Sequence, residues 1–171
     1  EHGVGYIPEN RTTDGVVAAF TIAENMMINS SYKSRFTNGI NINFSARKEI
    51  AEQLVAEFDV RTPSADTPAG KLSGGNQQKV VVARELSRDV DLLVASQPTR
   101  GVDVGSIEFI HERLVTERDK GKAVVLVSTE LDEVLALADR IAVMYRGKIV
   151  DIVSPETSRE QLGKLMAGVA A

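Results

Sequence analysis

The chain has 171 residues, of which 43% are apolar and 26% are charged, and this composition indicates a soluble globular protein with one hydrophobic core. Its net charge of −4 argues against a free nucleic-acid-binding protein, which usually carries a basic face. The absence of cysteine excludes disulfides and thiolate metal sites, and no apolar run is long enough to span a bilayer. We therefore expect a cytoplasmic protein, with both histidines, His2 and His111, at its surface.

Residues 1–75 predict one short strand followed by a largely helical segment. Thr21 and Glu24 have the spacing of a capping box at the start of a helix. Further along, Ile50, Leu54 and Phe58 fall on one face of a second helix. In chain order we expect a strand over 3–7, a helix over 21–28, a polar loop over 30–45, an amphipathic helix over 46–58 and a connector over 60–71.

Residues 76–171 alternate short apolar strands with helices, which implies an α/β fold with a parallel sheet covered on both faces. Residues 20–75 then form a helical insertion. Thr157 and Glu160 predict a capping box for the last helix. In chain order we expect a helix over 76–87, a strand over 92–95, a helix over 106–119, a strand over 123–127, a helix through 131–138, a hairpin of 140–145 with 148–153, and a final helix.

The helix over 76–87 is apolar on more than one face, so we expect it to be mostly buried. Charged residues gather at its C-terminal end. We expect them to form surface ion pairs, which contribute little to stability. These residues are Arg84, Glu85, Arg88 and Asp89.

The start of this helix carries the clearest chemical motif. Adjacent glycines, Gly74 and Gly75, allow backbone N–H groups to approach an anion closely. Ser73 adds a hydroxyl donor, and the helix N-terminus adds a partial positive charge. The segment therefore predicts an anion-binding end. The alternative is a serine N-cap followed by two flexible glycines.

The longer run Leu72-Ser73-Gly74-Gly75-Asn76-Gln77-Gln78-Lys79, followed by an apolar helix, resembles the signature motif of ABC-transporter ATP-binding proteins. The usual form is Leu-Ser-Gly-Gly-Gln-Gln-Gln-Arg, so this sequence departs from it at Asn76 and Lys79. Asn followed by Gln-Gln-Lys is typical of the second ATPase half of tandem importers for simple sugars and nucleosides. The resemblance extends over essentially the whole chain.

The resemblance implies a partial P-loop NTPase core with a mostly parallel sheet, a helical subdomain at about 20–75, and a C-terminal hairpin and helix. Residues 1–19 and 76–171 supply the remaining core and tail. No Gly-x-x-x-x-Gly-Lys-Ser/Thr loop occurs, and the chain lacks an initiator Met, so we expect a truncated domain that begins before the Q-loop. The implied site residues are Ser73, Gly74, Gly75, Asn76 and Gln77 for ATP, Glu9 at the Q-loop and Asp103 in the D-loop.

Three positions depart from the family in a way that predicts impaired catalysis. Ser96 stands where an aspartate holds Mg²⁺, and Gln97 stands where a glutamate polarises the attacking water. Thr129 replaces the switch histidine, and we expect it to act only as the N-cap of the following helix. The alternative is compensation by a nearby carboxylate, for which the family layout offers only Glu9 and Asp103.

The predicted function is the energy-coupling ATPase of an ABC importer for nucleosides or simple sugars, with ATP and Mg²⁺ bound only in the complete paired ATPase. The implied partners are another ATPase half or a second copy, and transmembrane permease subunits, at the cytoplasmic face of the inner membrane. The segment Pro8–Arg11 lies either near the groove for the permease's coupling helix or in a plain turn. The main alternative is a non-catalytic module that only docks a partner. A DNA-repair ATPase lacks support, because neither coiled-coil insertions nor basic surfaces are present.

Overall fold

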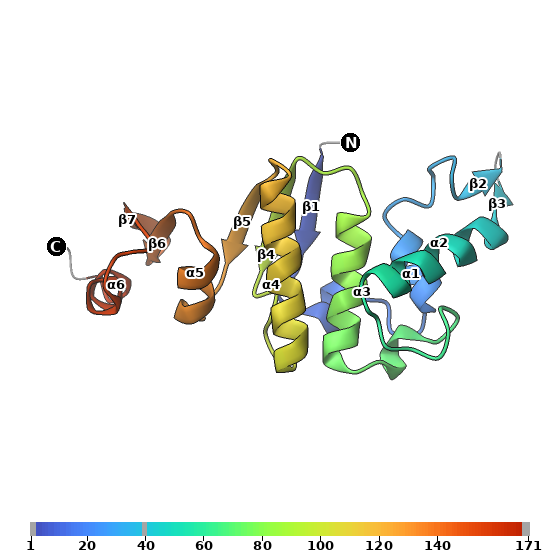
Figure 1. Ribbon diagram of the computed structural model, residues 1–171, viewed down its shortest axis with the longest axis horizontal. Coiled ribbons are helices and arrows are strands. Elements are labelled where there is room, and N and C mark those ends of the chain that lie inside the picture. Colours follow the sequence, from blue (N-terminus) through green and yellow to red (C-terminus); the bar gives the residue numbers. More distant parts are fainter. Residues whose placement is uncertain (1–2, 39–40, 169–171) are drawn as a thin grey trace. The chain divides into compact units, whose positions relative to one another are not determined.

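A computed structural model describes residues 3–38 and 41–168 (Figure 1). The chain forms two compact units, Glu1–Val127 and Ser128–Ala171, which are described separately below. The expectation for His2 lies outside the described residues, whereas His111 is half-buried on a helix. None of the helices in the described ranges is both long and apolar enough to cross a membrane. The predicted helical subdomain at about 20–75 stays a prediction.

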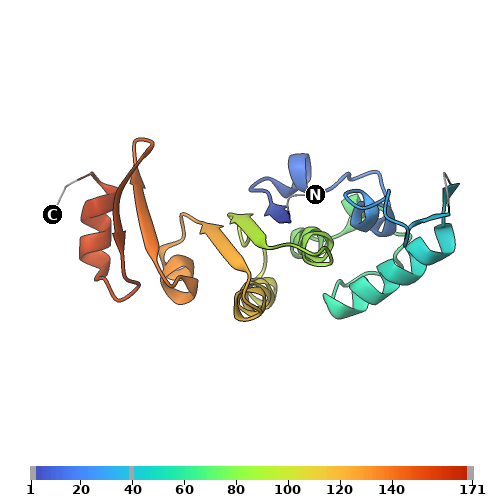
Figure 2. The same ribbon diagram turned by 90° about the horizontal axis from the view of Figure 1, so that it is seen from above.

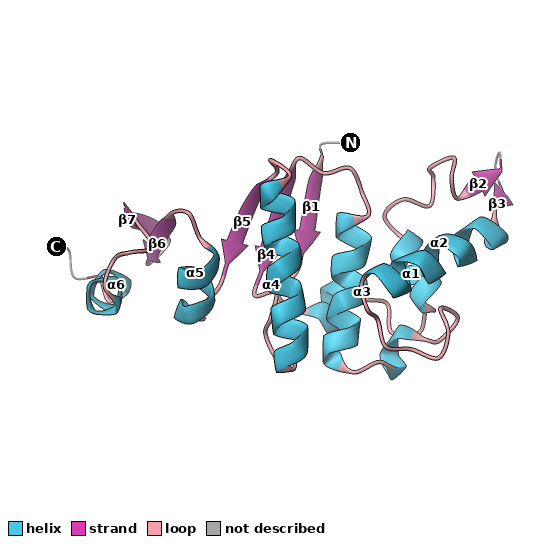
Figure 3. Cartoon of the chain, viewed as in Figure 1, coloured by secondary structure: helices cyan, strands magenta, loops and turns pink. Residues whose placement is uncertain are grey.

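The first unit is built on a three-stranded parallel sheet, as predicted. Its strands are β1 (Val4–Ile7), β4 (Leu92–Ser96) and β5 (Ala123–Val127), in the order β1-β4-β5. The central strand β4 pairs with β1 on one side and with β5 on the other, both in parallel. Figure 3 shows how helices and strands alternate from β4 onward, which is the alternation that the sequence predicts.

The sheet of the first unit is covered by α-helices on one face only. Helices α3 (Gly74–Leu86) and α4 (Val104–Asp119) lie on the same side of the strands (Figures 1 and 2). On the other face, four apolar side chains are between 40% and 52% exposed: Val4, Tyr6, Val125 and Val127. Within the described part of this unit, the expectation of a sheet covered on both faces is therefore wrong.

The helical part of the first unit contains α1 (Ile22–Met27) and α2 (Phe44–Glu57). The predicted capping box is confirmed, because the Glu24 N–H donates to Thr21 Oγ1 and the Thr21 N–H donates to Glu24 Oε2. The predicted loop over 30–45 is wrong in part. It contains a small hairpin, β2 (Thr37–Asn38) with β3 (Asn41–Ile42), and α2 begins early because Asn43 caps it.

Two short helical turns complete the first unit. The π-helical turn η1 (Arg11–Gly15) follows β1, and Asn10 caps it by accepting from the N–H groups of residues 12 and 13. The 3₁₀ turn η2 (Ala69–Lys71) leads into α3. Helix α3 is almost entirely buried, as predicted, and it begins at Gly74 rather than at Asn76 because Ser73 is its N-cap.

The second unit consists of α5 (Leu131–Leu137), the antiparallel hairpin β6 (Ile141–Tyr145) with β7 (Lys148–Val153), and α6 (Arg159–Met166). Its core contains Ile141, Val143, Leu162 and Leu165. The hairpin turns at Arg146 and Gly147, as predicted, and both residues have positive φ. The predicted cap of α6 is wrong. Ser158, not Thr157, accepts the N–H of Gln161, which places the helix start one residue later.

Candidate functional site

The signature segment places an exposed Ser73, a half-buried Gly74 and a buried Gly75 at the N-terminal end of α3. Ser73 has extended backbone, and its Oγ accepts from the Asn76 N–H at 3.4 Å and from Asn76 Nδ2 at 2.9 Å. Gly74 and Gly75 supply the first N–H groups of the helix, which have no intrahelical acceptor. Both interpretations of the motif are therefore compatible with this geometry: Ser73 is an N-cap, and this end can still present donors to an anion.

The next two residues of the signature bind the chain's own connector. Asn76 Oδ1 accepts from the Arg61 N–H at 2.7 Å, and Gln77 Nε2 donates to the carbonyls of Ala69 and Leu72 at 3.2 and 3.3 Å. Gln77 is only 9% exposed. In this structure these amides hold the segment before α3 against the helix, and Ser73 is the exposed residue at the start of the helix.

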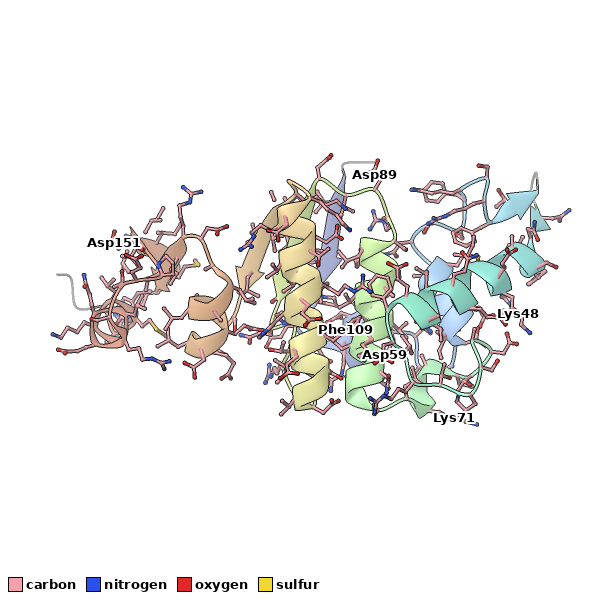
Figure 4. The ribbon with its side chains drawn as sticks, in the orientation of Figure 1. Lys48, Asp59, Lys71, Asp89, Phe109 and Asp151 are labelled. Atoms are coloured by element: carbon pink, nitrogen blue, oxygen red, sulfur yellow. The ribbon has the colours of Figure 1, made fainter. Side chains whose placement is uncertain are left out.

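Lys79, the last residue of the signature, is buried against the segment that follows α2. Its Nζ donates to the backbone oxygen of Asp59 at 3.0 Å and to Asp59 Oδ2 at 2.7 Å. It also lies 4.6 Å from the centroid of the Phe109 ring. Figure 4 labels Asp59 and Phe109, the two partners of Lys79. The hydrogen bond from Lys79 lowers the pKa of the Asp59 carboxyl below its usual value.

The two signature glycines are required by packing within the chain. A Cβ on Gly74 would lie 2.5 Å from Arg11 Nη2 and 3.3 Å from the carbonyl oxygen of Gly101. A Cβ on Gly75 would clash with the carboxylate of Asp103 and the hydroxyl of Ser106. The start of α3 thus packs against the segment after β1 and the loop before α4, and a side chain at either position would require these neighbours to shift.

The segment after β1 contacts the loop before α4 through two charged side chains. Glu9, which the sequence resemblance assigns to the Q-loop position, forms an ion pair with Arg100. Arg11 donates from Nη1 to the carbonyl of Arg100 at 2.7 Å and from Nη2 to the carbonyl of Gly101 at 3.0 Å. These residues line an open depression of about 640 Å³ together with Tyr6, Asn10, Thr12 and Asp14.

Asp103, which the sequence resemblance assigns to the D-loop, is the N-cap of α4. Its carboxylate accepts from the Ser106 N–H at 3.0 Å and from Ser106 Oγ at 2.9 Å. The hydrogen bonds from Ser106, the side-chain bond first, lower the pKa of Asp103 below its usual value. Asp103 and Glu9 thus both have partners of their own, and the structure offers no support for either as a replacement for the catalytic carboxylates.

The end of β4 carries the two neutral residues that the sequence resemblance assigns to the Walker B position. Ser96 pairs with Val127 of β5 in the sheet, and the Gln97 N–H donates to the Val127 carbonyl at 2.7 Å. Gln97 has a φ of 48°, a left-handed conformation that is strained for a residue with a side chain. Among the described residues, no group of three His, Cys, Asp or Glu side chains could hold a metal ion. Neither Ser96 nor Gln97 supplies the carboxylate that commonly binds Mg²⁺ in proteins.

Thr129 belongs to the second unit, where it precedes α5. The N-cap residue of α5 is Glu130, and its side chain makes no capping hydrogen bond. The Glu130 N–H donates to Ser128 Oγ at 3.0 Å. The expectation that Thr129 caps this helix is therefore wrong, because the helix begins one residue further along.

A buried charge network at the C-terminal end of α3 was not expected from the sequence. Glu85 is 2% exposed and accepts from Arg84 Nε at 2.9 Å and from Arg88 Nη1 at 2.8 Å. It also accepts from Asn29 Nδ2 at 2.7 Å, while Arg84 Nη1 donates to the Gly15 carbonyl at 2.7 Å. The expected surface ion pairs are therefore wrong for these residues. The apolar faces of the helix were the available signal, since charges on a buried helix need buried partners.

The sequence is similar to several curated import ATP-binding proteins, although no protein-family model matches it. It is 48% identical over 98% of its length to the guanosine import ATP-binding protein NupO of Bacillus subtilis. It is 49% identical, again over 98% of its length, to the nucleoside import ATP-binding protein NupA of Lactococcus lactis. The chain spans about a third of the length of each of these relatives, 33% in both cases.

Solved structures give the same fold. The ATP-binding cassette MJ0796, in a dimeric post-hydrolysis state bound to ADP and Pi, matches 91% of this chain with a TM-score of 0.73 and 22% identity. A second dimeric structure of that bacterial ABC transporter cassette matches 90% of the chain with a TM-score of 0.72. Together with the import ATP-binding relatives, the α/β architecture and the signature at the start of α3 lead to one assignment. The chain belongs to the ABC ATPase family.

Proposed function

We propose that this chain is part of the energy-coupling ATPase of an importer for nucleosides or simple sugars, as the second of two ATPase halves. The observation that carries the proposal is the identity of 48% and 49% to guanosine and nucleoside import ATP-binding proteins over 98% of the chain. A ribose import ATP-binding protein of Hahella chejuensis is 40% identical over 88% of the chain. The higher identities favour nucleosides.

In this proposal the chain contributes its signature to an ATP site whose phosphate loop and catalytic carboxylates belong to the partner half. The exposed Ser73 and the backbone N–H groups of Gly74 and Gly75 are the donors that would face a nucleotide phosphate. Asn76 and Gln77 hold these donors in place indirectly, because they bind the connector over 60–71 to the start of α3. The dimeric state of the similar ATP-binding cassette supports this pairing.

The ATP site that carries Ser96 and Gln97 is proposed to be impaired. Serine and glutamine are neutral, and glutamine is a poor base, so neither replaces the charge that the metal and the attacking water require. The ion pair of Glu9 with Arg100 and the capping role of Asp103 support this view, because both carboxylates are already engaged. ATP and Mg²⁺ are thus expected to act productively only at the partner's catalytic residues.

The remaining partners are the transmembrane permease subunits, which would hold the ATPase at the cytoplasmic face of the inner membrane. The open depression beside Glu9 and Arg11 supports a docking place for the permease's coupling helix near Pro8–Arg11. Its lining is largely polar and charged, which suits a contact that forms and rearranges during transport.

The test is the substitution Ser73→Arg in the complete importer, because the long side chain would block the nucleotide-facing end of α3. We expect ATPase activity and uptake to fall by about 10²-fold or more, as when a preorganised donor set is lost. Lys48→Gln on α2 is the control, since Lys48 forms an exposed ion pair with Asp66. Unchanged uptake and ATPase activity in the Ser73→Arg variant would contradict the proposal.

A further inference from the structure

The segment after β1 meets the signature at a single arginine. Arg11 uses both terminal nitrogens of its guanidinium, one on the Arg100 carbonyl at 2.7 Å and one on the Gly101 carbonyl at 3.0 Å. These acceptors lie 89 and 90 positions further along the chain. A planar guanidinium can hold two neighbouring carbonyls at once, which an ammonium cannot do with a fixed geometry. Arg11 therefore defines the position of the loop between β4 and α4 relative to β1.

The same guanidinium also limits how the signature helix is placed. Arg11 Nη2 would lie 2.5 Å from a Cβ on Gly74, and the Gly101 carbonyl that it binds would lie 3.3 Å from the same Cβ. The first turn of α3 thus packs directly on the pair formed by Arg11 and Gly101. Gly101 has a φ of 65°, so the loop that presents this carbonyl depends on glycine as well.

The loop that Arg11 holds leads to the second contact with the signature. Two residues after Gly101, the Asp103 carboxylate caps α4 through Ser106 and occupies the space beside Gly75. The signature is therefore held from two sides, by Arg11 at Gly74 and by Asp103 at Gly75, and one guanidinium connects both sides through the loop.

We propose that Arg11 is a positioning residue that sets the place of the signature donors, Ser73 to Gly75, and of the Asp103 loop for the partner's nucleotide. This inference rests on the proposed function, because it assumes that the signature serves an ATP site. Arg11 does not contact the nucleotide. It acts through the two carbonyls and through Gly74, so its loss displaces donors that remain chemically intact.

The proposal makes Arg11 and Gly74 energetically dependent on each other. A methyl group at position 74 requires the guanidinium to shift away from its present place, so we expect Gly74→Ala to disturb the contact that Arg11→Met removes directly. If glycine is needed at position 74 because the nucleotide approaches closely, the methyl group is harmful whatever stands at position 11. A double-mutant cycle separates these two causes.

The experiment measures kcat and KM for ATP in the complete importer reconstituted with its permease, for Arg11→Met, Arg11→Lys, Gly74→Ala and the double variant Arg11→Met with Gly74→Ala. We expect each of Arg11→Met and Gly74→Ala to lower kcat/KM about tenfold, mainly through a higher KM, and the double variant to be no worse than Arg11→Met alone. Arg11→Lys recovers part of the loss, because one carbonyl keeps a charged donor.

Lys48→Gln is the control, and Ser73→Arg is measured beside the set. Additive losses in the double variant, or wild-type kinetics for Arg11→Met while Ser73→Arg is inactive, would overturn the positioning role and leave the proposed function standing. Wild-type activity of Ser73→Arg would instead contradict the proposed function itself. A fall in kcat with unchanged KM for Arg11→Met would also overturn the positioning role.

Discussion

The two ends of α3 differ in chemistry: the N-terminal end carries a serine and two glycines, and the C-terminal end carries buried charged side chains. At its N-terminal end, Ser73 is exposed, and an added Cβ on Gly74 or Gly75 would lie within 2.5 Å of a neighbouring side chain. At its C-terminal end, Glu85 and Arg84 are buried and bind the segments after β1 and α1. One end carries the exposed serine of the proposed nucleotide contact, whereas the other end is held by buried charged side chains. The difference shows that the position of the signature depends on buried residues outside the motif as well as on the motif itself.

The largest expected effect comes from breaking the anchored end. Glu85→Gln removes the charge that Arg84 and Arg88 share in a site where Glu85 is 2% exposed. Breaking a buried pair typically costs about 3–5 kcal/mol, because it leaves an uncompensated charge. We expect a loss of this size in the unfolding free energy, measured by denaturant titration.

The matched control for this substitution is Lys48→Gln on α2. Figure 4 labels Lys48. Lys48 and Asp66 form an ion pair with both side chains 52% exposed, and such pairs contribute about 0–1 kcal/mol. If the two substitutions change the free energy of unfolding equally, the buried charge network at the C-terminal end of α3 does not anchor the helix.

A smaller effect is expected at the open end. Gly75→Ala introduces a Cβ that clashes with the Asp103 carboxylate and lies 3.1 Å from Ser106 Cβ. Overpacking of this kind costs about 1–3 kcal/mol. The same substitution should have the opposite sign at Gly163, a glycine inside α6 where an added Cβ would meet nothing within 4 Å. There we expect a gain of about 0.5–1 kcal/mol, because alanine favours a helix.

Thermal unfolding of the two alanine variants, followed by circular dichroism, tests this pair. Because Gly75 and Gly163 belong to different units, the transition of each unit must be resolved. Destabilisation by both substitutions to the same extent would mean that helical propensity, and not the space around Gly75, decides the outcome.

The smallest expected effect is a pH dependence of stability, caused by the ion pair between Asp59 and Lys79 of α3. The hydrogen bond from Lys79 lowers the pKa of Asp59 in the folded chain. Folding therefore favours the ionised carboxylate, so this contribution is fully present above the ordinary aspartate pKa of about 4 and is lost as the pH falls below it. Because the Asp59 side chain is 60% exposed, the change is modest.

Asp59→Asn removes this titration while keeping an oxygen that can accept from Lys79. Denaturant titrations at neutral pH and below pH 4 should show a smaller loss of stability on acidification in the variant than in the unaltered chain. An identical acid dependence in both would show that Asp59 does not contribute to it.

Regular elements were largely predictable because their patterns are local. The strands over 92–95 and 123–127 are apolar runs between turn signals, and the capping box of Thr21 with Glu24 spans one helical turn. The hairpin of β2 with β3 was not predictable, because strands of two residues carry no periodicity. The exposed face of the sheet could not be predicted either. Val125 and Val127 are apolar, and an apolar strand sequence does not reveal whether another element covers it.

The candidate site also contains residues that could be predicted from the sequence and residues that could not. The signature could be recognised from adjacent residues, and the neutral residues Ser96 and Gln97 from their place after a strand. The role of Arg11 could not, because its partners are backbone carbonyls far along the chain and any residue type provides a carbonyl. Glu85 was misjudged for a related reason, since a helical sequence does not say which segment will cover its charged end.

The order of strands in the sheet has a consequence for how the chain folds. Val4 of β1 pairs with Leu92 of β4 across most of the first unit, whereas β4 and β5 are joined by the single helix α4. Closing the longer loop costs more conformational entropy, so we expect β4 and β5 to pair first and β1 to dock late. Until then the edge of β4 can accept a strand from another molecule. Refolding at high protein concentration should therefore yield domain-swapped dimers, in which β1 of one molecule completes the sheet of the next.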